Sequence, residues 1–304
     1  MLTAPADLDL DELAALLERG WGLDDGLEYL PVGFGSHHWR AAGHFVTVDE
    51  LDAGHRVADD PFDALARAFA TAAWLDLDFV VAPIPDAEGR VLRRLGSRFA
   101  VAVLPWVDGE SFDWGYWDTD ETRSEMLALL DRLHAASVPD GLPRREWFGI
   151  PSRDALETAL RDLGREWTGG PFAERARELL ARHADLVRER LREYDERVAR
   201  APRDGWVLTH GEPHRGNAMR ARDGRLLLVD WDTTLVAPRE RDLWFVVGRD
   251  PRGTGADPEL LDLYGRWWAL ADLAVFTGVL YRPHADDDQT RASWDNLVED
   301  VGAL

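Results

Sequence analysis

The second half of the chain carries apolar residues at helical intervals. Between residues 172 and 201, a segment rich in Arg and Glu places apolar side chains at Leu179, Leu180, Ala184, Val187, Leu191 and Val198. This spacing predicts one long amphipathic helix whose charged residues form a solvated face. We expect further helices at residues 9–19, 61–74, 122–136 and 153–167.

Short apolar runs bounded by turn residues predict strands elsewhere. They lie at residues 27–30, 44–48, 90–95, 99–104, 205–209 and 225–229. The last two, with the turn Asp223-Gly224 between them, predict a β-loop-β unit. We therefore expect an α+β chain with a strand-rich lobe at residues 1–104, a hinge at 105–109 and a mostly helical lobe at 110–304.

Composition narrows the classes of partner. A chain of 304 residues is long enough for one large or two lobed domains with an ample core. Its 57 acidic and 35 basic residues give a net charge of −22, which disfavours nucleic acid and anionic membranes as partners. The chain has no cysteine, so disulfides and thiolate metal sites are excluded. With an acidic N-terminus and no long apolar run, we expect a soluble cytoplasmic protein.

The densest group of chemically useful residues spans residues 209–217 and 229–232. His210, Glu212 and Asn217 repeat the spacing of the kinase loop H-R-D-x-x-x-x-N, in which the acid takes a hydroxyl proton and the amide binds Mg²⁺. We expect His210 and Glu212 to be catalytic, and Asn217 and Asp230 to hold Mg²⁺ together with phosphates and water. The alternative is that Glu212 and Asp230 are ordinary strand-end carboxylates and that His214 is a solvated loop residue.

These motifs resemble those of the aminoglycoside phosphotransferases and related small-molecule kinases, which have the protein-kinase-like fold. Residues 210–217 are similar to the family's H-G-D-x-x-x-x-N, and residues 229–232 to its I-D-[WFL]-[DEG] motif. The resemblance implies a bilobal fold with a small antiparallel sheet in the N-lobe. It also implies that Asp242 buttresses the catalytic loop and that His134, in an L-x-x-L-H motif, is structural.

The chain departs from this pattern in two ways. Glu212 stands where the family has Asp, and the chain contains no lysine, so Thr47 takes the place of the kinase strand-three Lys. The following helix, residues 61–74, also lacks the partner Glu. Either Arg67 or Arg40 holds the phosphates instead, or the position has lost its function.

A glycine turn and the hinge are the expected nucleotide contacts. Residues 31–36 place Gly33, Gly35 and Ser36 between two strands, where backbone N–H groups can approach phosphate oxygens. In the hinge, the backbone of Pro105, Trp106 and Val107 is expected to meet the base of ATP or GTP.

The C-terminal region supplies candidate substrate contacts. In the family this region often closes over the substrate, and its carboxylates bind ammonium groups. The candidates are Asp232, Trp268, Asp286, Asp287, Asp288 and Trp294. Trp rings can add cation–π attraction. The alternative is that the acids are solubilising surface and the Trp residues are core.

We therefore expect a Mg²⁺-dependent O-phosphotransferase that moves the γ-phosphate of ATP or GTP to a hydroxyl of a small cationic molecule. An aminoglycoside-like antibiotic would fit, which implies antibiotic resistance. One alternative is a metabolic kinase for choline-like, amino-alcohol or sugar substrates. The other is a pseudokinase that binds a nucleotide without turnover.

Overall fold

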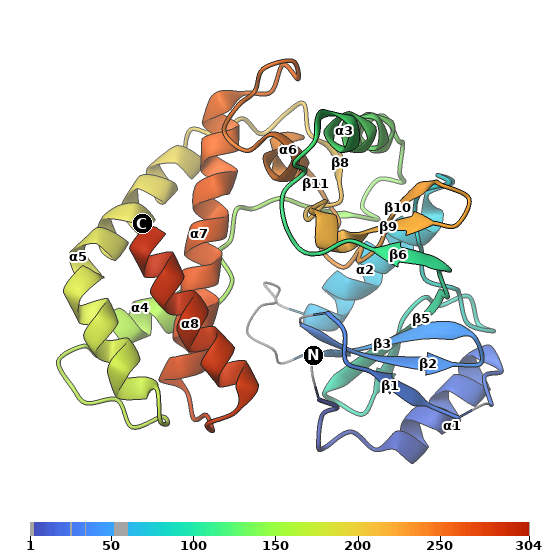
Figure 1. Cartoon of the computed structure of the whole chain (residues 1–304), viewed down its shortest axis with the longest axis horizontal. Helices are drawn as coiled ribbons and strands as arrows, with labels where there is room; N and C mark the ends of the chain where they lie inside the picture. Colours follow the sequence, from blue (N-terminus) through green and yellow to red (C-terminus); the bar gives the residue numbers. More distant parts are fainter. Residues whose placement is uncertain (1–2, 25, 34, 52–59, 304) are drawn as a thin grey trace. The chain divides into compact units, whose positions relative to one another are not determined.

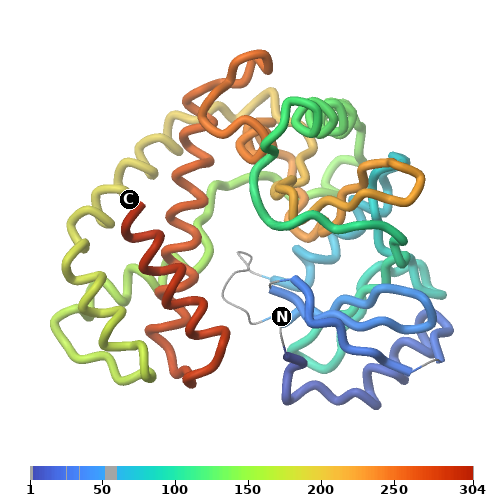
Figure 2. Tube along the Cα trace, viewed as in Figure 1, coloured from blue at the N-terminus to red at the C-terminus, as the bar shows by residue number. Residues whose placement is uncertain are grey.

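The computed structural model describes residues 3–24, 26–33, 35–51 and 60–303. These residues form two compact units. The second unit comprises residues 147–204 and 257–303, and the first contains the rest of the described chain. Figure 2 shows the chain leaving the first unit after residue 146, returning at 205 and leaving again after 256. The first unit therefore extends beyond the predicted N-lobe and includes the predicted catalytic loop.

Five strands form an antiparallel sheet in the first unit (Figure 1). Their order is β1 (Glu28–Leu30), β2 (Ser36–Ala41), β3 (His44–Glu50), β5 (Phe99–Pro105) and β4 (Arg93–Leu95). Side chains alternate between the two faces along each strand. The predicted small antiparallel sheet is thus confirmed.

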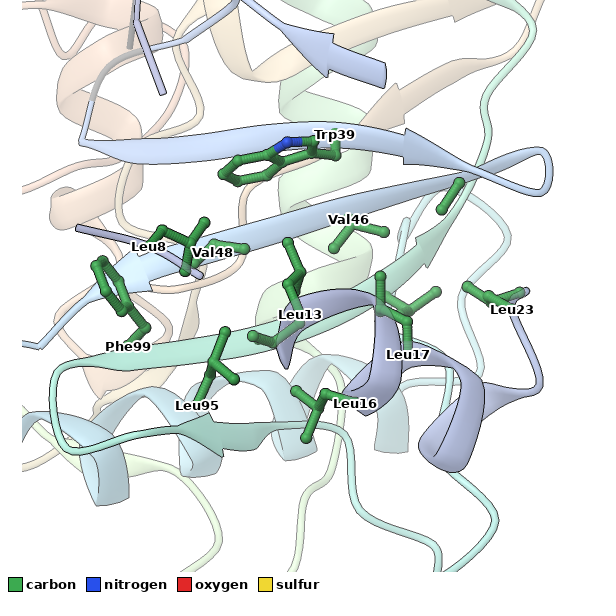
Figure 3. Packing of buried hydrophobic residues seen from close by; sticks show 13 residues of the cluster. Leu8, Leu13, Leu16, Leu17, Leu23, Trp39, Val46, Val48, Leu95 and Phe99 are labelled. Carbon is green, nitrogen blue, oxygen red and sulfur yellow. The ribbon is translucent and has the colours of Figure 1, made fainter. Parts of the chain in front are cut away.

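Helix α1 (Leu10–Trp21) covers one face of this sheet, and Figure 3 shows its contacts. Asp9 caps the helix by accepting the backbone N–H groups of Asp11 and Glu12. Leu13 and Leu17 of α1 belong to one buried cluster with Trp39 and Val46 of the sheet.

Helix α2 (Pro61–Trp74) packs against the sheet through a second cluster, which contains Ala100 and Ala102 of β5. Val101 and Val103 of the same strand belong to the α1 cluster, so the two helices use opposite faces. Residues 61–74 form the helix that their sequence predicts.

The remainder of the first unit carries two three-stranded sheets and two helices, α3 (Asp120–His134) and α6 (Glu240–Val247). One sheet contains β6 (Gly109–Ser111), β9 (Ala218–Ala221) and β10 (Leu226–Leu228). The other contains β7 (Arg144–Arg145), β8 (Val207–Thr209) and β11 (Leu235–Ala237). The two strands of the predicted β-loop-β unit are both present, but they lie in different sheets, because β8 pairs with β11 and β10 pairs with β9.

The second unit is helical. It contains α4 (Arg153–Arg161), α5 (Ala173–Val198), α7 (Pro258–Tyr281) and α8 (Asp288–Ala303), and α7 packs against the other three. Helix α4 ends at Arg161 and is therefore shorter than the predicted helix at residues 153–167. Just after its end, the Trp167 indole N–H donates to the Asp162 carbonyl at 3.3 Å. Within the described ranges, no helix is both long and apolar enough to cross a membrane.

Candidate active site

The carboxylate of Asp242 holds the start of the loop that follows β8. Its Oδ2 accepts the backbone N–H of His210 at 3.1 Å and the Nε2–H of His134 at 2.9 Å, while Oδ1 accepts the Gly211 N–H at 2.6 Å. Burial alone would raise the pKa of Asp242, but the hydrogen bond from His134 and the nearby positive groups keep it below its usual value. The buttressing role of Asp242 and the structural role of His134 are confirmed.

His210 is fully buried, and both of its ring nitrogens serve the backbone. Nε2–H donates to the Val229 carbonyl at 2.9 Å, and Nδ1 accepts the N–H of Glu212 at 3.2 Å. Burial lowers the pKa of His210, which agrees with this neutral tautomer. Both ring nitrogens are engaged with the backbone, a geometry that shapes the loop, and the catalytic role expected of His210 stays a prediction.

Gly211 is required by its position. Its φ of 107° is disfavoured for residues with a Cβ, and a Cβ there would overlap the Arg241 guanidinium. That guanidinium donates to Thr209 Oγ1 and to the Thr233 carbonyl, both at 2.9 Å. Arg241 therefore joins α6 to Thr209 of β8 and to Thr233, next to Gly211 of the loop.

Glu212 and Asn217 are linked through the loop backbone. Asn217 Nδ2 donates to the Glu212 carbonyl at 3.1 Å, which leaves the Asn217 amide oxygen for a ligand. The side chain of Glu212 is 29% exposed, so it lies at the rim of the loop, whereas Asn217 is buried.

Asp230 lies one residue beyond a backbone contact with Asn217. The Val229 N–H donates to the Asn217 carbonyl at 3.0 Å, which brings the two proposed metal ligands to the same loop edge. Asp230 is exposed and has a φ of 64°, a left-handed conformation that Asp tolerates better than most residues. In the described part of the chain, no three His, Cys, Asp or Glu side chains gather as a metal cluster. An amide oxygen and one carboxylate are nevertheless the hard donors that Mg²⁺ takes beside phosphates and water.

On the sheet face away from α1, Thr47 lies beside a buried carboxylate that sequence reasoning missed. Thr47 Oγ1 donates to Asp49 Oδ2 at 3.3 Å, and the expected phosphate contact Ser36 donates to Asp49 Oδ1 at 2.6 Å. Asp49 is 1% exposed. Both hydroxyls are therefore already engaged, and an acid occupies the region where the family has a cation.

The glycine turn has the backbone that the sequence predicts. Gly33 and Gly35 have φ values of 72° and 89°, which favour glycine. His38, opposite Thr47 on β2, lies close to Gly33, and its Nδ1 has no hydrogen-bond partner among the described residues. Burial lowers the pKa of His38 to about 4, so this imidazole is neutral.

The two candidate phosphate-binding arginines, Arg67 and Arg40, both contact other residues of the protein. The guanidinium of Arg67 donates to the carbonyls of residues 141–143, including 3.2 Å to Leu142. The Arg40 guanidinium lies 4.6 Å from the ring centroid of Trp106, which directly follows the hinge residue Pro105 at the end of β5. A phosphate-binding role for Arg67 stays a prediction, and it would require the loop contacts to break.

The acidic residues near the start of α8 have local partners. Asp287 Oδ1 accepts the Thr290 N–H at 2.8 Å, and Arg291 contacts Asp286 at 2.8 Å and Asp288 at 2.9 Å. The Arg175 guanidinium lies 4.4 Å from the Trp294 ring centroid, and Trp268 packs edge-on to Trp267 at 4.8 Å. These residues belong to the second unit, whereas Asp232 belongs to the first. Their role in substrate binding stays a prediction.

Three further titratable residues have environments that the sequence did not indicate. The side chain of His214, beside Glu212, is only 12% exposed rather than solvated, and burial lowers its pKa to about 4. In the second unit, burial raises the pKa of Asp272 to about 6 and that of Asp300 to about 7. No sequence signal indicated the two acids, because α7 and α8 were themselves not predicted.

Comparisons with known proteins agree with this geometry. Residues 49–279 match the model of the phosphotransferase enzyme family. Protein StrN of Streptomyces griseus is 30% identical over 287 residues, which cover 90% of this chain and 85% of that protein.

Solved structures show a related fold. A spectinomycin phosphotransferase in complex with ADP and spectinomycin superposes with a TM-score of 0.70 at 17% identity, covering 95% of this chain and 93% of that one. An amicoumacin kinase in complex with AMP-PNP and Ca²⁺ has a TM-score of 0.55 at 11% identity, with coverages of 97% and 94%. The fold is therefore protein-kinase-like.

Proposed function

The chain belongs to the phosphotransferase enzyme family, and from that premise we propose that it transfers the γ-phosphoryl group of ATP or GTP to a hydroxyl of a small cationic molecule. The observation that carries the proposal is the loop anchored by Asp242, in which Asn217 bonds to the Glu212 backbone and the Glu212 side chain is partly exposed. No lysine is needed for this part of the chemistry.

Glu212 acts as the base in this proposal. The acceptor oxygen bonds to the γ-phosphorus while the bond from phosphorus to the leaving ADP or GDP breaks. The hydroxyl proton passes to a carboxylate oxygen of Glu212. Asn217 and Asp230 would hold Mg²⁺, which neutralises charge on the transferring phosphoryl group. His210 keeps Glu212 in place through the backbone contact at 3.2 Å.

The nucleotide would lie against the sheet face that carries Thr47. The backbone of Gly33 and Gly35 would approach the phosphates, and residues 105–107 would contact the base. Because the chain has no lysine, backbone N–H groups and Mg²⁺ replace the usual ammonium contact.

The net charge of −22 supports a cationic acceptor. The spectinomycin phosphotransferase and the amicoumacin kinase share the fold of this chain. Their names favour an antibiotic as the acceptor class in this proposal. A metabolic amino alcohol is the second candidate, favoured by the similar fold of an aminopropanol kinase with a TM-score of 0.51.

A transfer screen tests the proposal. The purified protein is incubated with Mg²⁺, with ATP or GTP, and with one acceptor at a time. The acceptors are spectinomycin, an aminoglycoside, choline, ethanolamine and aminopropanol. We expect phosphorylated product with at least one acceptor, and none after Mg²⁺ is chelated. Nucleotide binding without turnover on any acceptor or on water would instead support the pseudokinase.

A further inference from the structure

His214 is a buried imidazole beside the catalytic carboxylate. Its side chain is 12% exposed, and its Nε2 lies 3.8 Å from Glu212 Oε2. The ring centroid lies 6.0 Å from that of Trp114 and 5.5 Å from that of Phe245. His214 is therefore held between two aromatic rings with one nitrogen toward Glu212.

The loop around His214 is fixed from both sides. The Trp117 indole N–H donates to the Pro213 carbonyl at 2.8 Å, and the Arg215 N–H donates to the Gly115 carbonyl at 3.1 Å. A Cβ on Gly216 would lie 3.2 Å from both Nδ1 and Cε1 of His214, so this edge of the ring abuts the loop. The imidazole consequently has little freedom to turn.

Packing alone does not account for an imidazole at this place. Nδ1 is buried and has no hydrogen-bond partner among the described residues. An unsatisfied buried polar atom is destabilising, and an apolar ring packed near Trp114 and Phe245 would avoid that cost. Burial lowers the pKa of His214 to about 4, so near neutral pH one ring nitrogen carries a hydrogen and the other does not.

Glu212 needs a positioning contact more than an Asp would. Its additional methylene adds a rotatable bond, and catalysis by positioning is sensitive to displacements of about 1 Å. In the loop, hydrogen bonds with His210 and Asn217 fix the backbone of Glu212, from which the longer side chain extends toward His214. A donor 3.8 Å away needs only a small movement to reach hydrogen-bond distance, as catalytic contacts often do when substrate binds.

We propose that His214 is a positioning residue whose Nε2–H donates a hydrogen bond to Glu212 Oε2 in the substrate complex and so fixes the base against the acceptor hydroxyl. The inference rests on the proposed function, in which Glu212 takes the hydroxyl proton.

Two substitutions separate the nitrogens of the ring. In His214→Gln the terminal amide nitrogen can reach the place of Nε2, whereas in His214→Asn it can reach only the place of Nδ1. His214→Phe keeps the aromatic packing without a donor. With water as the acceptor and Mg²⁺–ATP as the donor, ADP release should fall roughly 10-fold or more in the Asn and Phe variants at an unchanged KM for ATP. The Gln variant should keep most of the wild-type kcat.

A double-mutant cycle identifies the partner. Glu212→Asp withdraws the carboxylate from His214, so adding His214→Asn to Glu212→Asp should change kcat less than twofold. His183→Asn is the matched control, because His183 Nδ1 contacts the Leu179 carbonyl at 2.9 Å within α5 of the second unit. It should leave kcat unchanged.

Three results would overturn the inference alone: a wild-type kcat in the Asn variant, equal losses in the Asn and Gln variants, or the same effect of His214→Asn with and without Glu212→Asp. Melting curves that match the wild type exclude misfolding as the cause of a loss. If Glu212→Gln keeps full activity, or if the wild type releases no ADP with water or with any acceptor of the transfer screen, the proposed function fails and the inference fails with it.

Discussion

At the scale of single residues, hydrogen bonds to Asp242 and His210 fix the backbone of the loop that carries Glu212, and among the described residues the sheet face near Thr47 carries a buried acid. Thr47 and Ser36 both donate to Asp49, so this sheet face carries a buried acid where relatives of this fold have a cation. Arg67 is engaged by the carbonyls of residues 141–143. Under the proposed function, Mg²⁺ would therefore take a larger share of phosphate neutralisation than in an enzyme with a strand-three lysine, so we expect activity to be sensitive to changes in Asn217 and Asp230.

Asp230→Asn tests the metal site. Asn tolerates the left-handed backbone of this position, whose φ is 64°, so the fold should be kept while the ligand charge is lost. We expect Mg²⁺-dependent turnover to fall by roughly 10²-fold or more with a melting temperature close to that of the wild type. Turnover measured across a range of Mg²⁺ concentrations checks this. An unchanged dependence on Mg²⁺ would remove Asp230 from the site.

At the scale of elements, one carboxylate on α6 joins that helix to the catalytic loop and to His134 at the end of α3. Asp242 accepts three hydrogen bonds while fully buried. In Asp242→Asn, an amide N–H would face one of these donors and leave it unsatisfied. We expect a loss of roughly 2–4 kcal/mol in the free energy of unfolding, together with lower activity.

Urea denaturation measures that loss. Asp250→Asn is the matched control, since Asp250 lies at the surface and contacts Arg252 two residues away. It should change stability by less than about 0.5 kcal/mol. Equal, small effects in the two variants would show that Asp242 does not anchor the loop.

The elements also show how far the sequence reaches. Residues 61–74 form the predicted helix, because Asp60 caps it, Pro61 occupies its first turn and its apolar face is clear. Helix α7 was missed because its buried residues surround it on most sides and leave no polar stripe to define a period. Strands of three residues carry little register information, so the pairing of β8 with β11 could not be predicted.

The site was predicted to a similar degree. Spacing indicated Glu212, Asn217 and Asp230 because the loop is local in sequence. Asp49 and the burial of His214 were missed because their surroundings are built by distant segments: Asp49 by Ser36 of β2, and His214 by Trp114 and Phe245. Sequence spacing also suggested a catalytic role for His210 but did not indicate its two backbone contacts, which depend on how the loop folds.

At the scale of the whole molecule, two partly buried acids of the second unit make stability depend on pH. Burial raises the pKa of Asp272 to about 6 and that of Asp300 to about 7, and the negative charge of Asp272 adds to the shift of Asp300. Both folded-state values lie above the ordinary value of 3.8, so the native state binds more protons than the unfolded state between about pH 4 and pH 7. The stability that these groups contribute is therefore present at low pH and is lost as the pH rises through 7.

Asp300→Asn removes the part of this pH-dependent loss of stability that Asp300 contributes. We expect the variant to melt roughly 2–4 °C above the wild type at pH 8 and at about the same temperature near pH 4. Asp295→Asn, at an exposed position on the same helix, is the control and should show no such crossover. A constant difference between Asp300→Asn and wild type across the pH range would contradict the assigned pKa shift.

The measurement that tests the central claim most directly is the turnover of Glu212→Gln. Gln keeps the shape and the backbone contacts of Glu212 but cannot accept the hydroxyl proton. The account predicts that kcat for transfer from Mg²⁺–ATP falls by roughly 10²-fold or more, while the affinity for ATP, measured by titration calorimetry, changes less than about twofold. Equal kcat values for the variant and the wild type would contradict the assignment of Glu212 as the base.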